Sequence, residues 1–149
     1  MLPPPFHPPM TVRVERVFDL PAPPADVWAF IADDERRARP ISVVRDYEKT
    51  GDRTAIWHVE LPIPRLDRTV DVETEDVERE EPRYVRFVGR SRAMDVQGEH
   101  TLEPTDDGTR LTNQFVVDGR LPGVETYFKR KLDGELANLE TAVREHLAG

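Results

Sequence analysis

Apolar residues near the end of the chain recur at helical spacing. Between Leu121 and Leu147 they lie three or four positions apart, and polar residues occupy most of the positions between them. At roughly 100° per residue, the apolar residues fall on one stripe of an α-helix. Glu125 and Lys129, four residues apart, form an oppositely charged pair that supports such a helix. A helix of this kind is unstable alone, so we expect it to cover an apolar surface elsewhere in the chain.

The residues before this helix alternate between apolar and polar side chains, as strands with one buried face do. Thr11–Leu20 predicts a first strand, and Pro24–Ala38 predicts two short helical turns that Pro40 stops. The Asp107-Gly108 pair predicts a hairpin between the last two strands. Six strands are expected after the short helices, at Ile41–Lys49, Ala55–Leu61, Val70–Glu75, Tyr84–Arg90, Met94–Leu102 and Arg110–Val117.

This order of elements predicts an α+β fold. Strands joined by short turns form an antiparallel sheet, here of about seven strands, with the two short helices between strands 1 and 2. One face of the sheet alternates cleanly apolar, which suits a sheet with one covered and one solvated face. The long C-terminal helix is the natural cover. We expect one domain over residues 11–149, preceded by a disordered, proline-rich tail at residues 1–10.

Composition narrows the classes of function. The net charge of −8 argues against a nucleic-acid surface, which needs a basic stripe. The chain has no cysteine, which excludes disulfides, a thiol nucleophile and a cysteine-based zinc site. No apolar run approaches the length of a membrane span, and residues 1–10 lack the features of a signal peptide, so we expect a cytoplasmic protein. No cofactor is expected.

A metal site is not expected either. The four histidines, His7, His58, His100 and His146, show no metal-ligand spacing. Many acidic residues lie at the polar positions of neighbouring strands, which predicts a solvated outer face rather than a calcium loop. These residues are Asp71, Glu73, Glu75, Asp95 and Glu99.

Three segments resemble the START/Bet v 1-like (SRPBCC) superfamily. They are Phe18–Asp33, Gly98–Pro104 and Gly108–Thr112, and the amphipathic C-terminal helix completes the pattern. The most similar branches are the polyketide cyclase/dehydrase proteins and the proteins related to a small component of carbon monoxide dehydrogenase. The resemblance covers Val12–Leu147 and implies a helix-grip fold, in which a curved sheet grips the long helix. The stretch Arg37–Val44 departs from the pattern, because it lacks an aromatic residue and a Pro-Gly turn.

The resemblance also implies a cavity between sheet and helix. Mostly apolar side chains with a few polar groups would line it, as is usual for small-molecule pockets. Alternatively, the same side chains fill the space as an ordinary core. The candidate lining residues are Trp57, Val59, Val72, Phe87, Met94, His100, Asn113, Phe115 and Val117 of the sheet, and Val124, Tyr127, Phe128, Lys131, Leu132 and Glu135 of the helix.

The polar candidates each have two interpretations. His100 lies on the apolar face of its strand. It is a general acid or base, a core histidine satisfied by a neighbour, or a histidine at a strand end that reaches solvent. Asn113 would orient a ligand carbonyl or bond His100. Glu135, near the apolar stripe, would be an acid or base, would hold a ligand hydroxyl, or would form a salt bridge with Lys131. Arg16 interrupts the first strand and is either a counter-ion for an acidic ligand or turned outward by a bulge.

Three hypotheses for function follow. The preferred one is a protein that binds or carries a hydrophobic or amphipathic small molecule, lipid or polyketide-like, without chemistry. The second is a cyclase/dehydratase-type enzyme in which His100 or Glu135 serves as the acid or base. The third is an interaction or maturation factor that acts through a protein partner, and a homodimer is also open. Members of the resembled superfamily include binders, enzymes and regulators, and fold alone does not decide between them.

Overall fold

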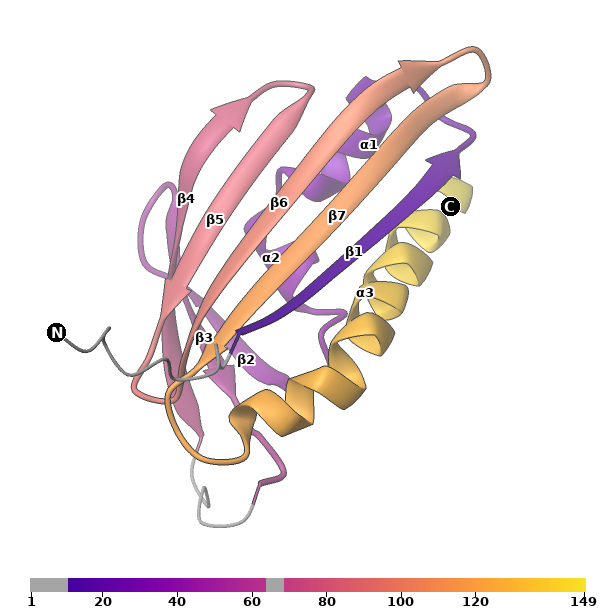
Figure 1. The fold of residues 1–149 in the computed structure, drawn as a ribbon. Helices are drawn as coiled ribbons and strands as arrows, with labels where there is room; N and C mark the ends of the chain where they lie inside the picture. Colours follow the sequence, from indigo (N-terminus) through magenta and orange to yellow (C-terminus); the bar gives the residue numbers. More distant parts are fainter. Residues whose placement is uncertain (1–10, 64–68) are drawn as a thin grey trace, which may run out of the picture.

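The computed structural model describes residues 11–63 and 69–149 (Figure 1). The predicted tail at residues 1–10 lies outside the described residues. Within these two ranges, seven strands and three helices follow one another in the predicted order. The elements are β1 (Thr11–Leu20), α1 (Pro24–Ile31), α2 (Asp34–Ala38), β2 (Val44–Lys49), β3 (Thr54–Val59), β4 (Val70–Glu80), β5 (Tyr84–Arg90), β6 (Met94–Thr105), β7 (Gly108–Gly119) and α3 (Val124–Ala148).

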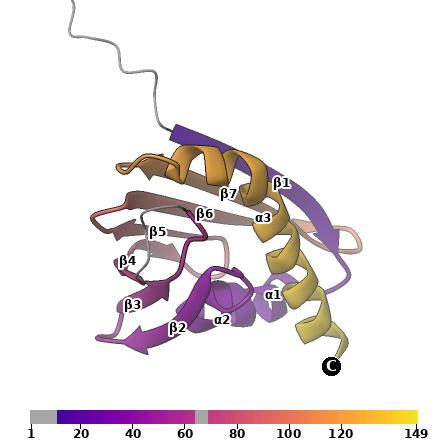
Figure 2. The same cartoon turned by 90° about the horizontal axis from the view of Figure 1, so that it is seen from below.

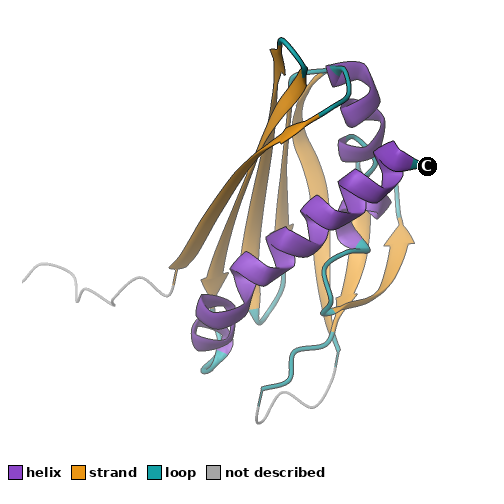
Figure 3. Ribbon diagram, turned by 90° about the vertical axis from the view of Figure 1, so that its right-hand side faces the viewer, coloured by secondary structure: helices purple, strands orange, loops and turns teal. Residues whose placement is uncertain are grey.

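The strands form one antiparallel sheet in the order β1-β7-β6-β5-β4-β3-β2. Sequential strands from β2 to β7 are neighbours, and β1 closes the sheet beside β7. The sheet is curved, and all three helices lie on its concave side (Figure 2). Helix α3 runs diagonally across that side near β1 and β7 (Figure 3), whereas α1 and α2 lie further along it. The predicted α+β helix-grip fold is confirmed.

Alternation along the strands sets which side chains enter the core. In β6, every second residue from Met94 to Leu102 is buried, and the residues between them are only partly covered. The acidic residues predicted on the outer face do point away from the core; Asp71, Glu73 and Glu75 are exposed. The inner face is therefore apolar and the outer face solvated, as the alternation predicts.

Three boundaries differ from the prediction, each for a local reason. Strand β2 starts at Val44 rather than Ile41, because residues 41–43 make turn contacts after α2. Strand β4 continues to Glu80, past Glu75, because a bulge between Asp76 and Glu78 shifts its register and breaks the alternation. Helix α3 starts at Val124 rather than Leu121, because Gly123 adopts a left-handed conformation at φ 93°.

Candidate ligand-binding site

A small cavity lies between the inner face of the sheet and α3. Its volume is about 20 Å³, and roughly 10–15 Å³ is needed to hold one water molecule. Every lining side chain except Glu135 is apolar. The interior is therefore almost completely filled in this state. The lining residues are Ile41, Val43, Val44, Trp57, Val59, Met94, Val96, Phe115, Val117, Phe128, Leu132 and Glu135.

Most of the candidate residues lie at or beside this cavity. Trp57, Val59, Met94, Phe115, Val117, Phe128, Leu132 and Glu135 line it directly. Val72, Phe87, His100, Asn113 and Val124 do not line it, but they are buried. Sequence reasoning missed Ile41 and Val43, because they were assigned to a strand and instead belong to the connection before β2, which folds over the cavity. The only signal for them was their apolar character.

Two candidate helix residues lie elsewhere. Lys131 is exposed, and Tyr127 is half-buried. Both line a surface groove of about 470 Å³ next to Ile63 and Gly123, outside the cavity. Their placement in the cavity was wrong, because they lie at the border of the apolar stripe of α3. Helical periodicity alone does not decide which side of that border faces inward.

His100 and Asn113 form a buried polar pair on the inner face. They are direct partners across β6 and β7, and both side chains are fully buried. Nδ1 of His100 lies 2.7 Å from Oδ1 of Asn113. Nε2 of His100 and Nδ2 of Asn113 have no hydrogen-bond partner among the residues that the structure describes. Because buried polar groups are nearly always bonded, these two atoms mark a place where a polar group of a ligand or a water molecule would be stabilised.

Burial also decides the protonation state of His100. Loss of solvent, and then the nearby positive charge of Arg37, lower the pKa of His100 to about 3. The ring is therefore neutral at physiological pH. A group with so low a pKa is a weak base and holds no proton to donate as an acid near neutrality. His100 is suited to hydrogen bonding rather than to acid–base catalysis.

Aromatic rings separate this pair from the cavity. Phe87 stacks on His100 with 6.2 Å between ring centroids, and Phe115 meets His100 edge-on at 5.9 Å. Gly98 lies between Phe87 and Phe115 in the sheet register. A Cβ atom on Gly98 would overlap the Phe87 ring. Glycine at this position thus allows Phe87 to lie flat across β6, between cavity and polar pair.

A buried ion pair also lies beside Phe87. Nη2 of Arg37, in α2, donates to Asp76, in β4, at 2.5 Å, and both side chains are buried. Nη1 of Arg37 donates to the carbonyl oxygen of Ile31 at 2.9 Å, and its guanidinium lies 5.3 Å from the Phe87 ring centre. Sequence reasoning missed this pair. The charged run around Arg37 is typical of a solvated face. Asp76 continues the inward alternation of Val72 and Thr74, but the predicted strand ended at Glu75.

Glu135 anchors the connection before β2 to α3. Its buried carboxylate accepts hydrogen bonds from the backbone N–H and Oγ of Ser42, at 3.0 and 2.9 Å, and from Asn138 at 3.1 Å. Within the described part of the chain it makes no ion pair with Lys131, so the predicted salt bridge is wrong. The carboxylate holds Ser42, and with it Ile41 and Val43, against the cavity.

Arg16 faces inward, and the predicted bulge is absent. Strand β1 pairs with β7 without a register shift, and Arg16 lies opposite Asn113. Its guanidinium bonds Asp133 and Glu140 of α3, at 3.4 and 3.0 Å. Arg16 thus ties the helix to the edge of the sheet.

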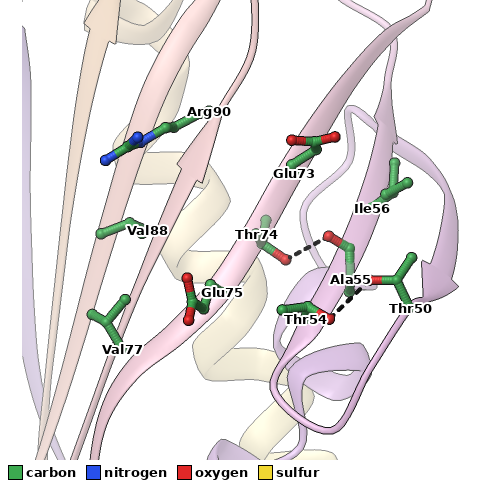
Figure 4. Close-up of a pocket in the computed structure, with 10 residues that line it drawn as sticks. All are labelled: Thr50, Thr54, Ala55, Ile56, Glu73, Thr74, Glu75, Val77, Val88 and Arg90. Carbon is green, nitrogen blue, oxygen red and sulfur yellow. Dashed lines mark hydrogen bonds between the residues drawn. The ribbon is translucent and has the colours of Figure 1, made fainter.

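The outer face of the sheet carries a larger but different recess. It has a volume of about 550 Å³ and lies over β3, β4 and β5, with α3 on the far side of the sheet (Figure 4). Glu73, Glu75 and Arg90 line it with a few short apolar side chains. It is open to solvent and charged, which does not suit an apolar ligand.

Neither a membrane helix nor a metal cluster is found in residues 11–63 and 69–149. No helix there is long and apolar enough to cross a membrane. No group of three or more His, Cys, Asp or Glu side chains is placed to hold a metal ion.

The curved sheet, the gripped helix and the cavity between them define a START-like helix-grip domain. Residues 11–144 match the family described as polyketide cyclase / dehydrase and lipid transport, and the chain belongs to this family. No curated protein sequence matches the chain.

Solved structures from several bacteria share the fold. A Deinococcus radiodurans protein is 18% identical, with a TM-score of 0.70, and the match covers 93% of this chain and 99% of that one. The ZhuI aromatase/cyclase from Streptomyces sp. R1128 is 17% identical, with a TM-score of 0.63 and coverage of 90% and 94%. A START superfamily protein from Mycobacterium smegmatis is 13% identical, with a TM-score of 0.68 and coverage of 89% and 94%. At these identities the similarity extends to the fold alone.

Proposed function

We propose that this protein binds or carries a hydrophobic or amphipathic small molecule between its sheet and α3, without catalysing a reaction. The observation that carries the proposal is the buried His100–Asn113 pair, which has unpartnered polar atoms inside an otherwise apolar interior. Ligand pockets combine apolar walls with a few convergent polar groups in this way. Membership of a family that includes lipid transport supports the same interpretation.

The proposal requires the interior to open. Pockets for drug-sized ligands have volumes of roughly 300–1,000 Å³, whereas this cavity measures about 20 Å³. Few polar contacts connect α3 to the rest of the protein. Arg16 bonds Asp133 and Glu140 near the surface, where ion pairs contribute about 0–1 kcal/mol. Glu135 accepts two hydrogen bonds from Ser42, and Arg144 donates to the carbonyl oxygen of Asp19. The buried stripe of α3 otherwise makes apolar contacts, and an apolar ligand would replace these as it enters.

The protonation chemistry favours binding over catalysis. The pKa of His100, lowered to about 3, makes it a poor acid or base at neutral pH. The Glu135 carboxylate is already engaged by Ser42 and Asn138, which suits an anchor. The cyclase/dehydratase hypothesis would need one of these two groups to act. A protein partner, a homodimer and a cytoplasmic location stay predictions.

The test is ligand binding measured on the purified protein. Native mass spectrometry should detect a co-purifying small molecule, or thermal shift should rise with at least one member of a panel of a fatty acid, a sterol and a flat aromatic polyketide. Val117→Phe, which fills the cavity, should abolish the shift. Val116→Phe, one residue along β7 on the outer face, is the matched control and should leave it intact. No bound molecule and no shift with any probe would overturn the proposal.

A further inference from the structure

The His100–Asn113 pair presents one donor and one acceptor to the interior. With the amide oriented so that Oδ1 accepts from Nδ1–H of His100, the free atoms are an acceptor, Nε2, and a donor, Nδ2. If the amide were rotated, Nδ1 would accept, and the free groups would be Nε2–H and Oδ1. Either orientation leaves one donor and one acceptor. The site therefore offers a ligand one donor and one acceptor whichever way the Asn113 amide is oriented.

The charges around the pair are already balanced. Arg37 lies beside Asp76, and Arg16 lies beside Glu140. The buried carboxylate of Glu135 has only neutral hydrogen-bond partners. Each of these guanidinium groups already pairs with a carboxylate, although the Nε atoms of Arg16 and Arg37 have no hydrogen-bond partner among the described residues. A ligand carboxylate would therefore add a negative charge that no further positive charge offsets, and burying such a charge is strongly unfavourable. An ammonium group would offer donors only, which match just one of the two free atoms.

We infer that the pair selects ligands with an uncharged hydroxyl group, which donates to one free atom and accepts from the other. This inference rests on the proposed function and names the chemical class that the same site prefers. His100 and Asn113 are then specificity-determining residues: they touch the hydroxyl, and the apolar part of the ligand lies towards Trp57, Phe115 and α3. Phe87 must move aside, because its ring packs against His100 and also against Trp57 and Phe115, which line the cavity.

A matched set of probes tests this inference by calorimetric titration of the full chain. The probes are 2-naphthol, 2-naphthoate, 2-naphthylmethylammonium and 2-methylnaphthalene, which share the ring system and differ in the substituent. Two additional neutral hydrogen bonds should make 2-naphthol bind about tenfold more tightly than 2-methylnaphthalene. The two charged probes should bind more weakly than 2-naphthol. In ¹⁵N NMR, Nε2 of His100 should shift with 2-naphthol and not with 2-methylnaphthalene.

The matched variant replaces both polar residues with apolar ones of similar shape, His100→Phe with Asn113→Leu. Removing both partners together avoids an orphaned polar group, so the fold should persist. The preference for 2-naphthol over 2-methylnaphthalene should fall towards about one in this variant. If the double variant does not fold, Asn113→Leu alone replaces it, with its fold verified by circular dichroism. This single variant should also lower the preference for 2-naphthol over 2-methylnaphthalene.

The outcomes separate the two proposals. Equal binding of all four probes, or tighter binding of 2-naphthoate, overturns the hydroxyl preference and leaves ligand binding standing. An unchanged preference in folded variants overturns the roles of His100 and Asn113. If the naphthalene probes and the wider panel all fail to bind, the proposed function fails, and this inference fails with it.

Discussion

Acid should destabilise this protein through one side chain, His100. Its ring is fully buried, and burial together with Arg37 lowers its pKa from the ordinary 6.5 to about 3. The unfolded chain therefore binds a proton at a pH where the folded chain does not. His100 contributes its full stability above pH 6.5, and this contribution is lost as the pH falls from 6.5 towards 3.

The magnitude follows from the width of that window. Between pH 6.5 and pH 4.0, a span of about 2.5 pH units, His100 binds a proton in the unfolded chain but not in the folded one. At about 1.36 kcal/mol per pH unit, the free energy of unfolding falls by about 3 kcal/mol over this span. A loss of this size is a large fraction of the roughly 5–15 kcal/mol by which domains are stable. Other titrating groups add to the acid sensitivity, but they are common to the protein and to a variant that changes His100 alone.

The assay is urea unfolding followed by circular dichroism at pH 7, 6, 5 and 4, for the protein and for His100→Gln. The difference in unfolding free energy between the two should shrink by about 3 kcal/mol from pH 7 to pH 4. His58→Gln is the control. Asp71 raises the pKa of His58 above its usual value, so His58 stabilises the fold below pH 6.5 and loses this effect as the pH rises through its folded pKa. Parallel pH curves for the protein and His100→Gln, or an NMR titration of His100 near 6.5, would refute the reasoning.

Three further predictions concern stability in urea unfolding. Arg37→Met removes the closer of two arginines from the buried Asp76 carboxylate and leaves Arg79 at 3.7 Å, so it should cost about 3 kcal/mol, the lower end for breaking a buried pair; adding Asp76→Leu should recover much of the loss, and no recovery would contradict a buried pair. Gly98→Ala should cost about 1–3 kcal/mol because its Cβ overlaps the Phe87 ring; Phe87→Leu in the same chain should lessen the cost, and additive losses would count against the contact. Glu135→Ala removes hydrogen bonds that Ser42 donates to a charged carboxylate and should cost about 1.5–3 kcal/mol, more than Glu135→Gln; equal losses would argue against an anchoring carboxylate.

Helical and strand periodicity accounts for most of the fold. Both patterns are local, since alternation along a strand and a 3.6-residue repeat along a helix follow from backbone geometry. The inward direction of His100 and Asn113 could be predicted for the same reason, and both are buried where alternation places them. The start of α3 could not be predicted from periodicity, because it depends on Gly123 adopting a left-handed conformation.

The site depends on contacts between distant segments, which no local pattern encodes. Lys131 and Glu135 lie one turn apart on α3, yet one is exposed and the other is buried against Ser42. The difference arises because the connection before β2 packs on only one side of the helix. Asp76 faces inward at the end of the alternating part of β4 and meets Arg37 from α2. Two charges that look solvated in the sequence therefore form a buried pair.

The amino-acid sequence by itself determined the order of elements, the apolar face of the sheet and the helix that covers it, because these follow from side-chain periodicity. Only the tertiary structure decided how much space remains between them. The cavity volume depends on how Phe87 lies over Gly98 and how Ser42 is held by Glu135. The tertiary structure also decided that His100 is neutral. Its pKa depends on complete burial and on the charge of Arg37, a residue 63 positions away in the chain.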